Sequence, residues 1–401
     1  MNQKKYYPTA LALYMTYFIL GIAVTIMSQY KQNFAAMWGA NQLADGTYDV
    51  STVMAVIAAT GLGRLIAFPI AGPFSDKCGR KQSALVGVLF FAIFFIGIVF
   101  VPNLYVAYVL MIFSGMANSF LDTSITPSCM EIFKENGAIA NLFTKFAISV
   151  SQFLLPFMIT FVAAQNMSFR TLYFVAAVII IIDGIFIAFL PFPPKEEATA
   201  AGEVKRPEKI KFTPSTIALI CIGFTATTTF QLYLNCNQEL GTLYGLSNPS
   251  MIQSFYSVGI VCAVFFTSFL MKKGLKPIRV LIIYPSIALV MLLVMYFVRI
   301  PQICLIGGFV IGYSAAGGVL QLATSTANEM FPANKGKITS IVMIVSSLAN
   351  YIVLNIAGML SRIGGENGPG YILLFNVAVT AVGILLAVIL NLRFEKDTQS
   401  I

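Results

Sequence analysis

Apolar stretches of about 20 residues recur along this chain, and they constrain its fold more than any other feature. Each of the twelve that can be marked is long enough to cross the roughly 30 Å hydrocarbon core of a bilayer as a helix. They lie near residues 8–30, 49–71, 82–101, 105–130, 139–164, 171–193, 214–236, 250–271, 279–298, 302–328, 338–361 and 370–392. The sequence therefore predicts an all-α polytopic membrane protein with twelve transmembrane helices.

The composition excludes several classes of protein. Only 10% of the 401 residues are charged and 58% are hydrophobic, whereas about a quarter of the residues of a soluble globular domain are charged. The six cysteines show neither a CxxC pair nor a paired extracellular spacing, so we expect no disulfide and no metal site. A phosphate-binding GxxxxGK loop, an HExxH pair and a nucleophile elbow are all absent from the sequence. We therefore expect no ATP, no cofactor and no enzymatic activity.

The distribution of lysine and arginine predicts the orientation of the chain. With the N-terminus in the cytoplasm, nineteen of the 25 basic residues fall in cytoplasmic segments and four in outer segments. Basic residues favour the cytoplasmic side, so both termini are expected to be cytoplasmic in a multi-pass protein of the cell membrane. The net charge of +9 then reflects topology and attraction to the lipid bilayer, and nucleic acid is not indicated as a partner.

A long polar stretch near the middle of the chain divides it into two halves. The sequence predicts an N-terminal six-helix bundle (1–193), a cytoplasmic linker (194–212) and a C-terminal six-helix bundle (213–401). Weak internal similarity supports this division. The Gly, Thr and Gln at positions 21, 25 and 29 recur at 223, 227 and 231, and the Glu-Ile-Phe at 131–133 recurs as Glu-Met-Phe at 329–331.

One short run carries the most specific motif. Residues 72–81 read GPFSDKCGRK and separate the second and third apolar stretches. The run resembles the loop between helices 2 and 3 of the major facilitator superfamily, written GxLADRxGRR, with matches at Gly72, Asp76, Gly79, Arg80 and Lys81. This resemblance implies two pseudo-symmetric six-helix bundles with a substrate site between them near mid-membrane. We expect the protein to act as a monomer.

The same resemblance implies a cytoplasmic gate. Its glycines would permit a tight turn, Asp76 would accept hydrogen bonds from the helix start near 337–339, and Arg80 would meet Glu131 at the foot of helix 4. The alternative is that Asp76 and Arg80 are solvated loop residues without a gating role.

Four charges fall away from the ends of the apolar stretches, namely Arg64, Asp122, Lys145 and Asp183. Such charges are costly in hydrocarbon and are functional candidates. Arg64 lies eight residues before Gly72, and Asp122 lies nine before Glu131, so we expect the two at comparable depth. The guanidinium fork of arginine suits a carboxylate, nitrate or phosphate, which makes Arg64 a candidate anion-binding residue. The alternative is a structural pair of Arg64 with Asp122, and the two roles can coexist.

Two further resemblances bear on these charges. A helix 2 arginine near glycines is similar to the nitrate and nitrite branch of the superfamily. Residues 115–123 loosely resemble helix 4 of fucose-permease-like carriers, where an acid takes the coupling proton, and this implies that role for Asp122. The chain contains no histidine, which also directs proton coupling to carboxylates. The first helix lacks the acid that those sugar carriers use, so fucose itself is not implied.

The other two intramembrane charges are interpreted as structural. We expect Asp183 to be a structural partner in a peripheral helix, and Lys145 to extend to the inner face or to pair with an acid. A substrate contact is the alternative for Lys145.

Uncharged polar residues concentrate in the seventh and tenth apolar stretches, at 214–236 and 302–328. The resemblance places these two helices along the central path. The expected substrate hydrogen bonders are Gln29, Asn118, Gln231, Asn235 and Gln321. The alternative is hydrogen bonding between helices, which is common for polar side chains in bundles.

The sequence thus favours a bacterial secondary active transporter that moves a small organic anion, such as a carboxylate or sugar acid, by proton symport and rocker-switch alternating access. A drug efflux antiporter is one alternative, which the 34 Phe and 17 Met keep open. A neutral sugar permease is a second, although the only tryptophan, Trp38, is placed in an outer loop. A receptor or scaffold with a carrier fold is the alternative outside transport.

Overall fold

The computed structural model describes residues 3–44, 46–133, 137–193, 212–331 and 335–399. Eleven helical stretches of this part of the chain are long and apolar enough to cross a membrane, and the last, Lys337–Thr398, contains two successive helices. The predicted all-helical membrane architecture is therefore confirmed. Contacts divide the chain into two units, Met1–Lys195 and Glu196–Ile401, and residues 194–211 of the expected linker lie outside the described residues.

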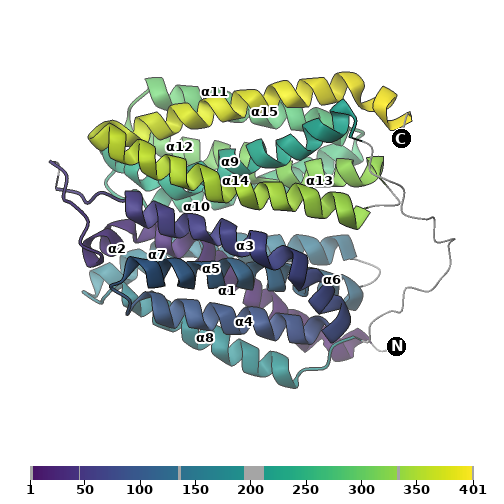
Figure 1. The fold of residues 1–401 in the computed structure, drawn as a ribbon, viewed down its shortest axis with the longest axis horizontal. Helices are drawn as coiled ribbons and strands as arrows, with labels where there is room; N and C mark the ends of the chain where they lie inside the picture. The colour runs from purple at the N-terminus through teal and green to yellow at the C-terminus, as the bar shows by residue number, and fades with distance from the viewer. Residues whose placement is uncertain (1–2, 45, 134–136, 194–211, 332–334, 400–401) are drawn as a thin grey trace. The chain divides into compact units, whose positions relative to one another are not determined.

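The N-terminal unit is built from long helices that lie roughly parallel or antiparallel to one another (Figure 1). Asn103 begins one of them, because its side chain accepts a hydrogen bond from the backbone N–H of Tyr105. The elements are η1 (Gln3–Tyr6), α1 (Tyr7–Gln29), α2 (Lys31–Met37), α3 (Ser51–Cys78), α4 (Arg80–Ile98), α5 (Leu104–Asp122), α6 (Ile125–Ile132), α7 (Gly137–Ala164) and α8 (Arg170–Phe189).

Glycines bring α3 and α5 into backbone contact. A Cβ atom added at Gly63 would lie 2.1 Å from the carbonyl oxygen of Ile112, and one added at Gly115 would lie 2.1 Å from that of Thr60. Small residues allow this close approach of helices within membranes. The contact holds Arg64, the neighbour of Gly63, against α5.

The C-terminal unit repeats the helical architecture. Its elements are α9 (Pro214–Leu243), α10 (Met251–Lys272), α11 (Pro277–Phe297), α12 (Pro301–Ile311), the π-helix η3 (Gly312–Ala316), α13 (Val319–Met330), α14 (Lys335–Gly364), η4 (Gly365–Asn367) and α15 (Gly368–Gln399). The Asp397 carboxylate accepts a hydrogen bond of 2.9 Å from the backbone N–H of Ser215. This bond joins the end of α15 to the first turn of α9.

Two helices that were predicted to be continuous are interrupted. The stretch 105–130 ends as α5 at Asp122 and resumes as α6 at Ile125. The stretch 302–328 passes through η3 and breaks before α13, where Gly318 has a φ of 129°. The prediction of single helices was wrong at both positions. Broken helices at corresponding positions of two repeats are typical of the binding regions of transporters.

The expectation of a loop at residues 72–81 was also wrong in part. Helix α3 continues to Cys78, and only Gly79, with a φ of 107°, separates it from α4. An L-residue is strained at that φ, so the turn requires glycine at Gly79. Gly72 is helical, and a Cβ there would meet nothing within 4 Å, so Gly72 does not permit a turn.

Candidate substrate and proton site

An ion pair joins α3 to α5 in the N-terminal unit. Arg64 Nη2 lies 3.3 Å from Asp122 Oδ2, which confirms that the two charges lie at comparable depth. The other carboxylate oxygen, Oδ1, accepts a hydrogen bond of 3.0 Å from the hydroxyl of Tyr17 in α1. The Tyr17 hydroxyl is also 3.1 Å from Thr126 Oγ1 in α6. One carboxylate therefore connects three helices and the segment beyond the break.

The position of Asp122 makes its charge dependent on these partners. Asp122 is the last residue of α5, and the C-terminal end of a helix dipole disfavours a negative charge. The positive charge of Arg64 and the hydroxyl of Tyr17 offset that effect. A substitution of Arg64 or Tyr17 therefore changes the electrostatic environment of the Asp122 carboxylate.

Arg64 retains unused hydrogen-bond donors. An arginine side chain has five N–H donors, and one of its nitrogens, Nη2, contacts Asp122. The guanidinium carbon also lies 5.5 Å from the centre of the Phe68 ring. The remaining Arg64 nitrogens donate no hydrogen bond to the described residues, and the side chains of Arg64 and Asp122 are 20% and 26% exposed. The pair is thus accessible and has donors for an anion.

The polar side chains proposed as substrate hydrogen bonders fall into two groups. Gln29 and Asn118 are buried in the N-terminal unit. In the C-terminal unit, Asn235 Nδ2 donates to Gln231 Oε1 at 3.1 Å, whereas Gln321 is exposed on α13. The structure brings Gln231 and Asn235 together.

The threonines of α9 instead hold helices together. Thr227 Oγ1 lies 2.7 Å from Ser346 Oγ in α14, and Thr229 Oγ1 lies 2.8 Å from Thr380 Oγ1 in α15. Thr227 and Thr229 therefore make hydrogen bonds between helices.

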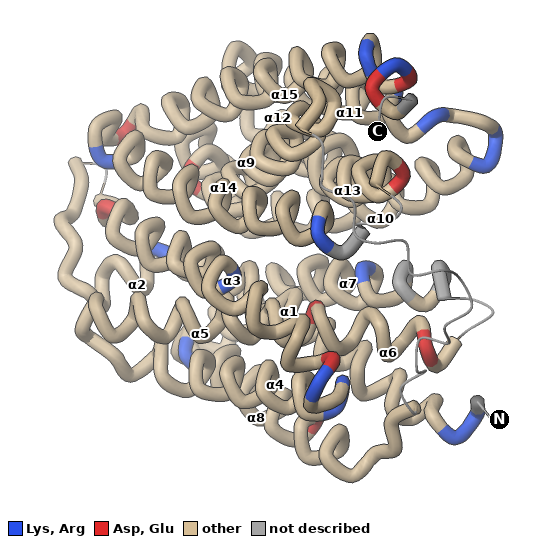
Figure 2. The backbone as a smooth tube through the Cα atoms, turned by 45° about the vertical axis from the view of Figure 1, so that its right-hand side comes forward, with Lys and Arg blue, Asp and Glu red and all other residues tan. Residues whose placement is uncertain are grey.

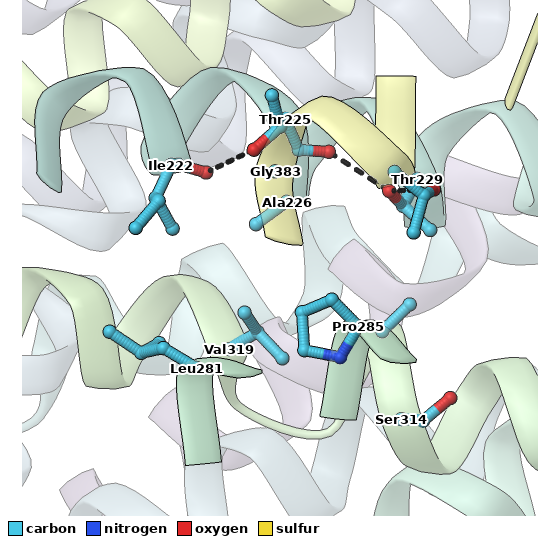
Figure 3. A pocket seen from close by; sticks show the side chains of 11 residues that line it. Ile222, Thr225, Ala226, Thr229, Leu281, Pro285, Ser314, Val319 and Gly383 are labelled. Carbon is cyan, nitrogen blue, oxygen red and sulfur yellow. Dashed lines mark hydrogen bonds between the residues drawn. The ribbon is translucent and has the colours of Figure 1, made fainter. Parts of the chain in front are cut away.

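An internal cavity of the C-terminal unit lies beside these threonines (Figure 3). Thr225 and Thr229 line one side of it, with Pro285 and Ser314 opposite. Its volume of about 10 Å³ is near the minimum for one water molecule. This cavity is too small for an organic substrate.

Arg80 is the centre of a polar cluster where α3 meets α4. Its Nη1 donates to Asp76 Oδ1 and Ser75 Oγ, both at 3.0 Å, and to the Thr123 carbonyl at 3.3 Å. Its Nε lies 3.6 Å from Glu131 Oε1, which confirms the expected Arg80–Glu131 contact. Arg80 thereby joins the end of α3 to both sides of the break between α5 and α6.

The structure also places Lys81, Lys145 and Asp183, the other charged residues singled out from the sequence. Lys81 Nζ donates to the Leu190 carbonyl beyond α8 at 3.2 Å, and Lys145 is exposed on α7. Asp183 is buried, and its carboxylate lies 2.6 Å from Thr16 Oγ1 in α1. Charged residues are otherwise sparse along the helices (Figure 2). No three metal-ligating side chains of the described residues gather at one place.

Sequence reasoning missed Thr16 and Tyr17. Hydroxyl side chains are common in the apolar stretches of this chain, and composition alone does not distinguish these two. No local signal in the sequence marks them, because the acids that they contact lie in other helices.

An apolar groove lies beside the N-terminal end of α1. Aromatic side chains of α1 and α7 line much of it, and its volume is about 660 Å³. The aromatic residues are Tyr14, Phe18, Phe133, Phe143 and Phe146.

Comparison with known proteins identifies the family. The family model described as Major Facilitator Superfamily matches residues 7–350. The chain belongs to the major facilitator superfamily. It is thus a membrane transporter, and the resemblance drawn from residues 72–81 is confirmed.

Bacterial members of the superfamily align with almost the whole chain. The chain is 31% identical to the uncharacterized MFS-type transporter YfkL of Bacillus subtilis, covering 97% of both chains. It is 32% identical to the inner membrane transport protein YdiM of Escherichia coli, covering 98% of this chain and 96% of that protein.

Solved structures share the fold at lower identity. The nucleoside transporter NupG (D323A mutant) has a TM-score of 0.74 at 12% identity, covering 94% of this chain and 98% of that one. A D-xylose-proton symporter has a TM-score of 0.72 at 15% identity, covering 96% and 97%. These similarities show the fold alone.

Proposed function

We propose that this superfamily transporter carries a small organic anion, such as a carboxylate or sugar acid, by proton symport. The observation that carries the proposal is the partly exposed Arg64, whose donors are only partly used by Asp122. A carboxylate substrate matches the unused donors of the guanidinium fork. Gln29, Asn118, Gln231, Asn235 and Gln321 supply the uncharged hydrogen bonds to the substrate.

Competition between the substrate anion and Asp122 for Arg64 couples transport of the anion to transport of the proton. When the anion takes the guanidinium, Asp122 loses its counter-charge at the C-terminal end of α5 and takes up a proton. Release of the anion returns Arg64 to Asp122, and the carboxylate gives up that proton on the same side as the substrate. One proton and one anion then cross together.

Alternating access requires a gate that opens on one side at a time. Asp76 and Arg80 close the cytoplasmic side, with Arg80 holding both Asp76 and Glu131. Gly72, Gly79 and Lys81 complete the gate segment. The protein works as a monomer in the bacterial cell membrane, with both termini in the cytoplasm.

The first experiment identifies a ligand. Purified protein is tested by thermal shift against carboxylates, neutral sugars and cationic drugs, because a ligand that binds the folded state raises the melting temperature. We expect stabilisation by a carboxylate or sugar acid. Stabilisation by neutral sugars alone would contradict the organic-anion proposal.

The second experiment tests Arg64 in liposomes that contain the reconstituted protein. Arg64→Lys and Arg64→Ala are expected to abolish uptake of the stabilising anion, because neither residue retains the fork. Arg299→Ala is a matched control, since Arg299 is exposed and, among the described residues, donates its hydrogen bond to the Tyr296 carbonyl of its own helix end. Normal uptake by both Arg64 variants would refute the anion-binding role.

The apolar groove beside α1 and α7 favours one other candidate function, which is efflux of apolar drugs by proton antiport. An apolar pocket of several hundred Å³ is typical of drug-sized ligand sites. Stabilisation by cationic drugs and no response to carboxylates would favour efflux over anion symport.

A further inference from the structure

A second carboxylate of the N-terminal unit lies apart from the Arg64–Asp122 pair. Asp183, in α8, is 5% exposed, and its Oδ2 atom lies 2.6 Å from the fully buried Thr16 Oγ1 of α1. This hydroxyl is its only partner among the described residues. Asp183 was interpreted from the sequence as structural, but its surroundings differ from those of an ordinary structural acid.

The hydrogen count at Thr16 indicates where the proton lies. Thr16 Oγ1 is also 3.1 Å from the carbonyl oxygen of Ala12, and both neighbouring oxygens are acceptors if Asp183 is ionised. A hydroxyl has a single proton, so it cannot serve both acceptors fully. If the Asp183 carboxyl carries a proton, it donates to Thr16, Thr16 donates to Ala12, and both contacts are hydrogen bonds.

The charges around Asp183 lead to the same conclusion. No described lysine or arginine forms an ion pair with it. Helix α1 contains no charged residue, and its Tyr14 and Tyr17 hydroxyls donate to Ala140 and Asp122. Helices α4 and α7 also pack on α8, and their charged residues are Arg80 and Lys81 in the first turn of α4 and Lys145, exposed on α7. The other titratable residues of α8 itself are Arg170 and Tyr173 in its first turn. An unpaired buried carboxylate is expected to be neutral.

We infer that Asp183 and Thr16 form a proton-binding site, occupied in this conformation and separate from the Arg64–Asp122 pair. Thr16 and Tyr17 are adjacent in α1, so their side chains point about 100° apart toward two acids on different helices. A displacement of α1 against α8 would remove the acceptor of the Asp183 proton. Proton occupancy is thereby linked to the position of the helix that also contacts Asp122.

Infrared spectroscopy of the purified full-length protein near neutral pH tests the site without any substrate. We expect a carbonyl stretching band of a buried protonated carboxyl group that Asp183→Asn removes. Thr16→Val is expected to shift the band, because the acid loses its hydrogen-bond acceptor. Asp122→Asn is expected to leave it unchanged.

A wild-type spectrum without the band, or a band that persists in full in Asp183→Asn, would overturn the inference. Thr16→Val provides an independent reading if Asp183→Asn does not fold, since an unshifted band would then place the proton elsewhere. A band lost in Asp122→Asn would also assign the proton to the other acid. Because no transport is measured, failure here is distinct from failure of the proposed symport.

Discussion

The Tyr17 hydroxyl donates a hydrogen bond of 3.0 Å to Asp122 Oδ1, the carboxylate oxygen that Arg64 does not contact. The two oxygens of Asp122 are thus held by different helices, α1 through Tyr17 and α3 through Arg64. Movement of α1 relative to α3 changes the environment of the carboxylate directly. This relationship makes Tyr17 a positioning residue for the proposed coupling acid.

Replacing Tyr17 with phenylalanine tests this role. Tyr17→Phe keeps the ring and removes the hydroxyl, so Asp122 loses a hydrogen bond to a charged group, which contributes about 2 kcal/mol. We expect a lower melting temperature in detergent and weaker stimulation of uptake by an inward proton gradient. Tyr14→Phe is the matched control, because Tyr14 donates to the Ala140 backbone carbonyl and not to a carboxylate. Equal gradient stimulation in Tyr17→Phe and wild type would contradict the positioning role.

Replacing Asp122 with asparagine separates proton coupling from substrate binding. Asp122→Asn is nearly isosteric but does not titrate, so an inward proton gradient should no longer accelerate uptake. Exchange of labelled for unlabelled substrate at equal pH should continue, since it requires no net proton movement. The two rates are measured in the same liposomes. An unchanged gradient response would move coupling to another acid, and Asp183 is the first to examine.

The contact between α3 and α5 is tested at its glycines. In Gly63→Ala the new Cβ would lie 2.1 Å from the Ile112 carbonyl, so the helices must separate, at a cost of about 1–3 kcal/mol. Separation also lengthens the Arg64–Asp122 pair, so we expect both the melting temperature and the uptake to fall. Gly72→Ala in the same helix meets nothing within 4 Å and should keep or raise the melting temperature. Equal melting temperatures for the two variants would refute the close contact.

The sequence was sufficient to predict the helices, and to place Arg64 and Asp122 at comparable depth, for a physical reason. Charges within apolar stretches are few, and helix geometry converts their spacing into depth. The break after Asp122 has a signal in the sequence that was overlooked, because Pro127 has no N–H to donate to the Thr123 carbonyl four residues earlier and its ring clashes with that carbonyl. The Thr123 carbonyl accepts hydrogen bonds from Ser75 and Arg80 of other helices in place of the helical bond.

The break in the C-terminal unit has a different origin, which is a tertiary contact. Gly317 packs so closely on α10 that a Cβ added to it would lie 2.2 Å from the Cβ of Ala263. Sequence reasoning sees the glycine pair at 317–318 but not the helix against which it packs. The hydroxyls of Thr16 and Tyr17 were missed likewise, because their importance comes from acids more than 100 positions away.

The Arg80 cluster gives a test of the gate segment that separates stability from transport. Arg80 holds Asp76, Ser75 and the Thr123 carbonyl through one nitrogen and Glu131 through another. Lysine retains the charge but not the planar fork, so Arg80→Lys is expected to keep most of the folding stability while uptake falls at least tenfold.

The matched control for Arg80→Lys is Lys276→Arg. Lys276 lies in an exposed pair with Glu395 at 3.4 Å, and such pairs contribute little to stability. Its uptake should match wild type. If Arg80→Lys also transports at the wild-type rate, the geometry of the Arg80 fork is irrelevant to gating, and the cluster serves only to hold α3, α5 and α6 together.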